Sequence, residues 1–274
     1  MTVEHVDADD LAAWEALFVR DVDEQPVQFV KLAHTDRPVW VAYQAGAYLG
    51  TVSAETDGSS TLWRVQATHE AHRTLKDAVR ALRRPASWPH EREEAARWAA
   101  GLLAGGSLLI ADVESTGLET PYAVQIAAID RTGNVVFNEY LQPNALIGPA
   151  AVAVHGIAPQ RVAKAATFGQ LLPRLTQTLH GRAVAAYNAG FDRGVFEREL
   201  RRHLGDPRAA QEWLGRIRWH DAMVPYAAWR GLWSAKRGTY RNQPLGGPHD
   251  AVADCRHLLT LLEAMARSAA ATGS

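Results

Sequence analysis

Two acidic residues, Asp112 and Glu114, follow the short apolar run 108–111. This run predicts a buried strand, and Gly105 and Gly106 break the chain just before it. Side chains at positions i and i+2 of a strand share one face, so we expect both carboxylates to project together. Like charges that close repel unless a cation lies between them, which favours a Mg²⁺ or Mn²⁺ site. A strand that simply ends in an acidic loop remains the alternative.

Three more polar residues occur where later strands and helices are expected to meet. Asp192 follows the predicted buried strand 182–187 and falls at a helix start, where the positive end of the helix dipole would also stabilise a carboxylate. His249 and Asp254 lie about one and a third turns apart near the start of the last helix, so both can face one cleft, although a lone histidine and aspartate on a helix are more often surface residues. Together the segments supply four acids and a histidine, a minimal set for two-metal phosphodiester hydrolysis.

The elements that would position these residues follow the order β-β-β-α-β-α-β-α. The fold class is therefore α/β, with a mixed sheet whose first three strands form an antiparallel meander and with helices on both faces. Neither G-x-G-x-x-G after a strand nor a P-loop occurs. The expected strands are 108–111, 122–129, 135–141, 182–187 and 216–219, and the expected helices are 149–155, 168–179, 193–203, 221–229 and 250–267.

The first hundred residues predict a small α+β domain, residues 1–85, whose role the sequence does not state. A short helix is expected from Asp9 or Asp10 through Phe18, and a longer one over 69–84. Strands are expected at 27–33, 39–43, 48–54 and 61–67. A linker helix over 86–105 then leads into the second domain, 106–268. On the helix over 69–84 a basic face could contact phosphates, although such faces are usually solvated; it comprises Arg73, Lys76, Arg80 and Arg84.

Composition limits the classes of protein. The 47% hydrophobic content supports a folded core, and the net charge of −1 means that nucleic acid must be bound by a local patch. The single cysteine, Cys255, cannot form an internal disulfide and is expected to fill space in a helix. The start of the chain lacks the features of a signal peptide, and no apolar run approaches the roughly 18 residues of a membrane span. We expect a cytoplasmic protein without a membrane partner.

Four runs of sequence resemble the DnaQ-like 3′→5′ exonuclease family, over about residues 106–267. They are Asp112-Val-Glu-Ser-Thr-Gly117, Val154-His-Gly-Ile157, Tyr187-Asn-Ala-Gly-Phe-Asp192 and His249-Asp-Ala-Val-Ala-Asp254. The opening run has Ser115 where threonine is commoner, at a position that is not a metal ligand. The resemblance implies a ribonuclease H-like sheet with its first strand at the centre. The resemblance does not extend to residues 1–85.

The resemblance also implies a mechanism. Asp112, Glu114 and Asp254 would bind one divalent ion, and Asp112 would bridge to a second, with Asp192 contributing directly or through water. Two Mg²⁺ or Mn²⁺ ions about 4 Å apart would activate the attacking water and stabilise the leaving oxygen. His249 would be the general base, because an unperturbed imidazole titrates near neutrality. The products would be nucleoside 5′-monophosphates.

The substrate would be nucleic acid with a free 3′ end, with single-stranded DNA expected and RNA as the alternative. Small residues after the opening acids would allow a close approach of the terminal nucleotide. The basic residues near Trp229, Trp233 and Tyr240 would suit a single strand, unless the two tryptophans pack in the core of a helix. The residues expected at the substrate are Ser115, Thr116, Gly117, Leu118, His155, Asn188, Phe191, Arg237 and Arg241, of which His155 is expected mainly to shape a turn.

Three other functions compete with this interpretation. A ribonuclease or oligoribonuclease of the same family would use the same acids. A proofreading or accessory subunit of a polymerase would share the fold, although only residues 268–274 follow the last predicted helix. A binding module would not need the complete set of five catalytic residues. Residues 1–85 could guide the substrate or bind a protein partner.

Overall fold

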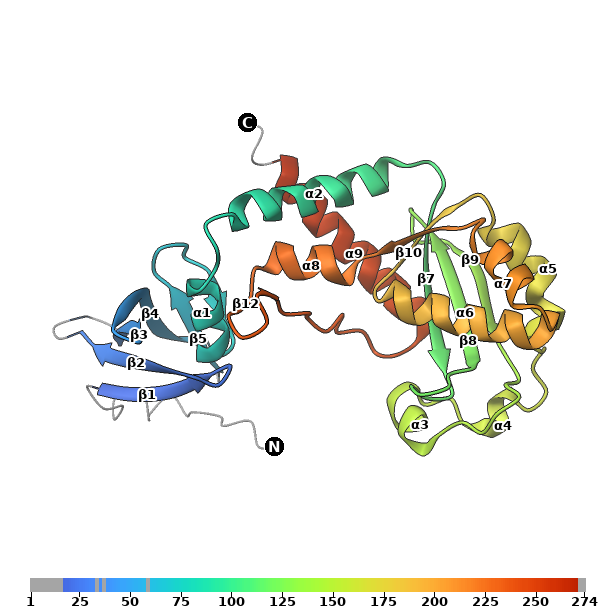
Figure 1. The fold of residues 1–274 in the computed structure, drawn as a ribbon, viewed down its shortest axis with the longest axis horizontal. Coiled ribbons are helices and arrows are strands. Elements are labelled where there is room, and N and C mark those ends of the chain that lie inside the picture. Colours follow the sequence, from blue (N-terminus) through green and yellow to red (C-terminus); the bar gives the residue numbers. More distant parts are fainter. Residues whose placement is uncertain (1–16, 33–34, 36–37, 58–59, 271–274) are drawn as a thin grey trace. The chain divides into compact units, whose positions relative to one another are not determined.

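A computed structural model describes residues 17–32, 35, 38–57 and 60–270 (Figure 1). The chain divides into two compact units. The N-terminal unit contains residues 1–92 and also residues 230–241, and the second unit contains residues 93–229 and 242–274. The prediction instead assigned residues 230–241 to the second domain.

The N-terminal unit is built on a six-stranded antiparallel sheet in sequential order β1 to β6. Alternate residues of its strands are buried, as expected for a sheet covered on one face. The core includes Phe29, Trp40 and Trp63 together with Val79 of the helix α1. The bounds are β1 Leu17–Val22, β2 Gln25–Lys31, β3 Val39–Gln44, β4 Ala47–Asp57, β5 Ser60–Val65, β6 Ala71–His72, α1 Leu75–Leu82, β12 Trp233–Ser234 and β13 Thr239–Tyr240.

Two helix predictions in this unit need correction. Most of the helix predicted from Asp9 or Asp10 lies outside the described residues, and its last two residues, Leu17 and Phe18, belong to β1. The helix predicted over 69–84 begins only at Leu75, where the Thr74 side chain accepts a hydrogen bond from Asp77 N–H. Pairing with neighbouring strands overrides the local helical spacing in both places.

The second unit contains the predicted mixed sheet, in the order β11-β10-β7-β8-β9. The strand β7 is central: β8 pairs with it antiparallel, β9 continues the meander, and β10 and β11 run parallel to it on the other side. The predicted fold class is confirmed. The bounds are β7 Leu108–Ser115, β8 Ala123–Asp130, β9 Val135–Tyr140, β10 Ala183–Ala186 and β11 Arg218–Asp221.

Helices cover both faces of this sheet. Leu108 and Ile110 of β7 pack in a cluster with residues of α2 and α9, whereas Leu109, Ala111 and Val113 pack in a cluster with α5, α6 and α7. Cys255 is buried in the first of these clusters, as its predicted packing role requires. The bounds are α2 Trp88–Ala104, α3 Pro149–His155, α4 Pro159–Val162, α5 Phe168–Leu179, α6 Ala189–Leu204, α7 Pro207–Leu214, α8 Met223–Arg230 and α9 Ala251–Ala270.

Three features of the helices went beyond or against the sequence analysis. Neither α4 nor α7 was predicted, and Trp233 lies in β12 instead of sharing a helix with Trp229.

None of the helices in the described part of the chain combines the length and the apolar character that crossing a bilayer requires.

Candidate metal centre

Strand periodicity directs Asp112 and Glu114 toward the helix α9. Because side chains alternate along a strand, they continue the row of Leu108 and Ile110, which pack in the cluster that contains α9. The residue between them, Val113, packs on the opposite face. The acids therefore leave the sheet on the side where Asp254, in the first turn of α9, can meet them.

The fourth acid, Asp192, follows the neighbouring parallel strand β10. The strand β10 leads into α6, whose first turn carries Asp192, and Asp192 is 5% exposed. Its carboxylate accepts a hydrogen bond from the backbone N–H of Val113, which ties the start of α6 to β7. At the end of β11, Asp221 accepts the N–H groups of Ala189 and Met223. The carboxyl ends of three parallel strands thus form one acidic edge.

One oxygen or nitrogen atom from each of Glu114, His249 and Asp254 lies within 4.8 Å of the other two, a spacing that could hold a metal ion. His249 Nδ1 is 4.0 Å from Asp254 Oδ2, and the His249 side chain is 58% exposed. Glu114 and Asp254 are almost fully buried. The histidine therefore lies on the solvent side of this group, and the two carboxylates lie on its buried side.

The surroundings of Asp254 fit a bound cation. Asp254 Oδ1 is buried and has no hydrogen-bond partner in the described structure. The backbone of Gly247 packs so closely that a Cβ there would lie 1.7 Å from this oxygen, so no other residue type fits. A buried carboxylate oxygen without a donor is costly unless a cation or water satisfies it. Hard divalent cations prefer such oxygen ligands.

Burial and mutual repulsion raise the pKa values of this acidic group. Burial raises the pKa of Asp112 well above its usual range, and the charges of Asp192, Glu114 and Asp254 add to the effect. Burial, with the charges of Asp254 and Asp250, raises the pKa of Glu114 to about 7. Burial also raises the pKa of Asp192 to about 7. No lysine or arginine in the described residues forms an ion pair with these acids.

The loop after β7 is held by its own polar groups. The Ser115 hydroxyl donates to the Gly117 carbonyl, and the Thr116 hydroxyl accepts the Tyr122 N–H. His155 Nδ1 accepts the Ile157 N–H, so its Nε2–H is the donor to the Ser115 carbonyl at 3.1 Å. The loop is therefore rigidly built, and it presents Leu118, which is 84% exposed, to solvent.

The other four residues expected at the substrate are divided between the two units. Asn188 is exposed just before α6, where its side chain forms no capping hydrogen bond, and Phe191 is half-buried against the core. Arg237 is exposed in the turn between β12 and β13. Arg241 forms an ion pair with Asp23 in the N-terminal unit. The first two belong to the unit that carries the acids, and the two arginines do not.

Sequence reasoning did not single out two contributors to the site. Asp250 adds negative charge beside Asp112 and Glu114, and its side chain accepts the Ala253 N–H at the start of α9. Gly247 allows the close approach to Asp254. The run Gly246-Gly-Pro248 directly before His249 was the sequence signal for a turn in which the backbone can approach a side chain closely.

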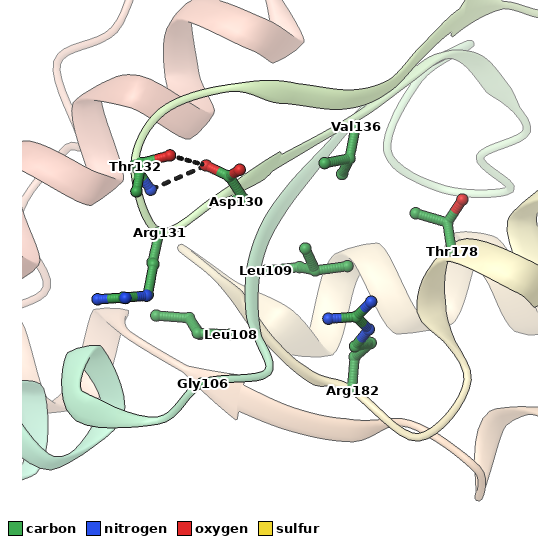
Figure 2. A pocket seen from close by; sticks show the side chains of 9 residues that line it. All are labelled: Gly106, Leu108, Leu109, Asp130, Arg131, Thr132, Val136, Thr178 and Arg182. Carbon is green, nitrogen blue, oxygen red and sulfur yellow. Dashed lines mark hydrogen bonds between the residues drawn. The ribbon is translucent and has the colours of Figure 1, made fainter.

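A depression of about 390 Å³ lies at the opposite end of β7 (Figure 2). It is lined by Leu108 and Leu109, which begin β7, and by Arg131 and Arg182. Asp130 also lines it, but two hydrogen bonds hold this carboxylate to Thr132. None of the four acids of the candidate centre lines this depression, so it is separate from that centre.

Comparisons with known proteins identify the family of the chain. The RNase T family profile, described as "Exonuclease", matches residues 109–262, more than half of the chain. The chain is 28% identical over 173 residues to the uncharacterized exonuclease CP81 of Escherichia phage 186, covering 58% of this chain and 88% of that protein. It is 30% identical over 104 residues to the DNA polymerase III subunit epsilon of Escherichia coli K12, covering 34% of this chain and 42% of that subunit.

Among solved structures, exonuclease X in complex with 5′-overhanging duplex DNA matches with a TM-score of 0.41 and 25% identity, over 60% of this chain and 93% of that one. The chain spans less than half the length of the polymerase subunit that it matches. The expected family is confirmed: this chain belongs to the RNase T/DnaQ-like exonuclease family, whose members are phosphodiester hydrolases.

Proposed function

We propose that the protein is a 3′→5′ exonuclease that removes nucleoside 5′-monophosphates from single-stranded ends, with DNA preferred to RNA. One observation carries this proposal: four acids from β7, α6 and α9 meet without a lysine or arginine partner in the described residues, and one buried oxygen of Asp254 has no hydrogen bond. Such a group needs cations to be stable in its charged form.

Two divalent ions, Mg²⁺ or Mn²⁺, would supply the Lewis acidity that activates water and stabilises the leaving 3′ oxygen. Glu114 and Asp254 would hold one ion, Asp112 would bridge both, and Asp192 would bind directly or through water. The hydrogen bond from Val113 N–H fixes the Asp192 carboxylate toward this centre. Because all four acids come from the ends of regular elements, they need little rearrangement on binding.

His249 would act as general base and take the proton of the attacking water. Its exposed imidazole lies at the solvent side of the acids, where water and substrate arrive, and Asp254 Oδ2 lies 4.0 Å from its Nδ1. His249 has a left-handed φ of +57°, which is uncommon for a residue with a side chain. A backbone constrained in this way fixes where the imidazole points.

The terminal nucleotide would lie against the loop after β7. Its serine and threonine hydroxyls are already bonded within the loop, so they would shape the surface and would not bind the substrate directly. The exposed side chain of Leu118 could then stack on or wedge beside the last base. Asn188 and Phe191, next to Asp192, would complete this surface.

Hydrolysis of matched oligonucleotides tests the proposal. A single-stranded DNA labelled at its 5′ end should shorten one nucleotide at a time with Mg²⁺ or Mn²⁺ and stay intact in EDTA. Phosphorothioate linkages at the 3′ end should block the reaction, whereas the same linkages at the 5′ end should not. Digestion from the 5′ end would contradict the polarity. Faster digestion of RNA would favour the ribonuclease alternative, because a 2′-hydroxyl can be read directly.

A further inference from the structure

We propose that the second unit carries a second contact surface for nucleic acid, which binds phosphates of the substrate strand several nucleotides away from the hydrolysed 3′ end. The inference rests on the proposed function, because that function supplies the ligand. The surface consists of four arginines of this unit, here called the basic edge: Arg131, Arg182, Arg216 and Arg218. Two of them, Arg131 and Arg182, line the depression at the start of β7, which is separate from the four acids (Figure 2).

Three of these arginines come from the segments that lead into the parallel strands β10 and β11. The Arg182 carbonyl accepts the N–H of Arg218 at 3.0 Å, and the Arg216 carbonyl accepts the N–H of Gly181 at 2.8 Å. Because β10 and β11 are parallel neighbours, residues that precede or begin them lie at one edge of the sheet. This is the edge opposite to the one that carries the acids.

Arg131 reaches the same edge from the turn between β8 and β9. Its neighbour Asp130 pairs with Leu109 near the start of β7, because β8 runs antiparallel to β7. Figure 2 shows Arg131 and Arg182 on opposite sides of the start of β7. The basic edge thus extends over the ends of four neighbouring strands, about 14 Å at a strand spacing of about 4.8 Å.

Within the described residues, no acid forms an ion pair with the basic edge, and all four of its arginines are exposed. Asp130 also lines the depression, but its carboxylate accepts two hydrogen bonds from Thr132 and two from Asn134. These neutral donors already satisfy this carboxylate. In the nearby helix α7, Glu212 is paired with Arg208. The positive charge of the basic edge is therefore available to a ligand.

Two histidines respond to this charge. Burial, together with the charge of Arg216, lowers the pKa of His180. Burial, together with the charge of Arg218, lowers the pKa of His220. A carboxylate paired with each arginine would offset this repulsion. The basic edge therefore produces a positive potential, which attracts anions.

The proposed substrate needs such a surface. With a net charge of −1 and four acids at the catalytic centre, the protein as a whole does not attract a polyanion. Arg237 and Arg241, which the sequence predicted at the substrate, belong to the other unit. In the predicted basic face of the first domain, Arg80 and Arg84 are ion-paired. The basic edge, by contrast, belongs to the unit that carries the acids.

The spread of the four charges favours a nucleic-acid strand over a single small anion. One phosphate or carboxylate cannot contact guanidinium groups distributed over about 14 Å, whereas a strand presents a phosphate about every 3.4 Å. Guanidinium groups also match the geometry of phosphate oxygens. We therefore assign the phosphate backbone of the substrate strand as the ligand.

The length of β7 sets the length of strand that can reach both contacts. From Leu108 to Glu114 the strand rises about 20 Å, and a path over the surface of the unit is longer. At about 3.4 Å per stacked nucleotide, at least about six nucleotides separate the basic edge from the hydrolysed end. A trinucleotide cannot occupy both places, but a 20-nucleotide strand can.

Arg182→Gln combined with Arg218→Gln in the full-length protein tests the inference. Fluorescence anisotropy of a labelled 20-nucleotide single-stranded DNA, in EDTA to prevent hydrolysis, measures binding. We expect Kd to rise about tenfold, because two charge-assisted contacts with phosphates are lost. The slope of log K against log salt should become shallower by about 1.4, at about 0.7 for each phosphate contact. Unchanged affinity and slope would overturn the inference and favour an acidic protein segment as the ligand.

The matched control is Arg201→Gln combined with Arg267→Gln. It removes the same net charge from the same unit, but these arginines are paired with Glu197 and Glu263. We expect its Kd and salt slope to equal those of the parent protein. Thermal unfolding of both double variants shows whether folded proteins are compared. Equal losses of affinity in the two double variants would overturn the inference, because bulk charge would then explain them.

Substrate length provides a second measurement, with Mg²⁺ present. For the double variant at Arg182 and Arg218, KM on the 20-nucleotide strand should rise about tenfold, with kcat changed less than about twofold. On a trinucleotide, both constants should stay within about twofold of the parent values. An equal rise of KM on both substrates would overturn the inference, because the substitutions would then act at the catalytic centre.

The two measurements distinguish failure of the inference from failure of the proposed function. If the parent protein hydrolyses neither substrate, the proposed function is wrong, and the comparison of affinities in EDTA still decides whether the basic edge binds nucleic acid. If the parent protein shortens DNA from the 3′ end and the double variant binds and hydrolyses the long strand equally well, the inference is wrong and the proposed function stands.

Discussion

Both units of this molecule contain buried carboxylates, and the partners of these carboxylates differ. In the N-terminal unit, Asp23 is surrounded by Arg80, Arg83 and Arg241. The hydrogen bond from Arg80 holds the pKa of Asp23 below its ordinary value. At the end of β7, acids of similar burial face one another, and burial raises the pKa values of Asp112 and Glu114.

This difference separates structural acids from acids that could bind a cation. A carboxylate that is ion-paired with arginine is most stable in its charged form, and the arginine is part of the fold. A group of acids without such partners is destabilised by its own charge, which natural proteins tolerate mainly at functional sites. The same residue type therefore has opposite consequences for stability in the two units.

The largest expected effect is on catalysis. Asp112→Asn should lower kcat at least about a thousandfold, because it removes the acid proposed to bridge both ions. The fold should persist, since the variant also removes one of the repelling charges. Oligonucleotide hydrolysis and thermal unfolding measure the two effects. Asp77→Asn, which removes an acid paired with Arg80, should retain the activity of the parent protein.

Stability in EDTA should fall as pH rises because of the acidic group at β7. A carboxyl whose pKa is raised in the folded state binds its proton more tightly there, so the free energy of unfolding falls between about pH 4 and pH 7. Glu114, with a pKa of about 7, should contribute on the order of 2 kcal/mol to this loss. Glu114→Gln should thus stabilise the protein at pH 8 relative to pH 5, and added Mg²⁺ should stabilise only the parent. An equal stability difference at both pH values would contradict the prediction.

Asp23 should show the opposite dependence on pH. Its pKa is lowered in the folded state, so its contribution is present above about pH 4 and is lost as pH falls through the folded value. Arg80→Met should destabilise the N-terminal unit by about 2 kcal/mol at pH 7, because it breaks the pairs with Asp23 and Asp77. Chemical denaturation at pH 7 and near pH 3 measures the change. The loss should be smaller at the lower pH, and a loss that does not depend on pH would count against the ion pair.

The smallest effect is expected for an exposed pair. Arg174 and Glu139 form an ion pair at 2.7 Å, but their side chains are 57% and 36% exposed. Arg174→Ala should lower the free energy of unfolding by less than about 0.5 kcal/mol, because water and salt screen such pairs. Denaturation at low and high salt checks this, and a loss above that of Arg80→Met would reverse the proposed ranking.

Several elements were predictable because their signals are local. The buried strand at 108–111 and the glycines before it predicted where β7 begins, and the spacing of Asp112 and Glu114 predicted their shared face. The helices α3 and α5 have the predicted bounds. For the basic face of the helix over 69–84, the sequence analysis considered contact with phosphates or exposure to solvent. The structure instead shows Arg80 and Arg84 in ion pairs within the protein.

By itself, the sequence determined the mixed sheet, the exonuclease family and the acids at the carboxyl ends of its strands, because each depends on residues close together in the chain or on recognisable motifs. Only the tertiary structure decided that β1 is a strand, that Arg241 pairs with Asp23 and that residues 230–241 belong to the N-terminal unit. These features join residues up to 218 positions apart. Spacing along the chain carries no information about such pairs, since the burial and charge of the whole fold select them.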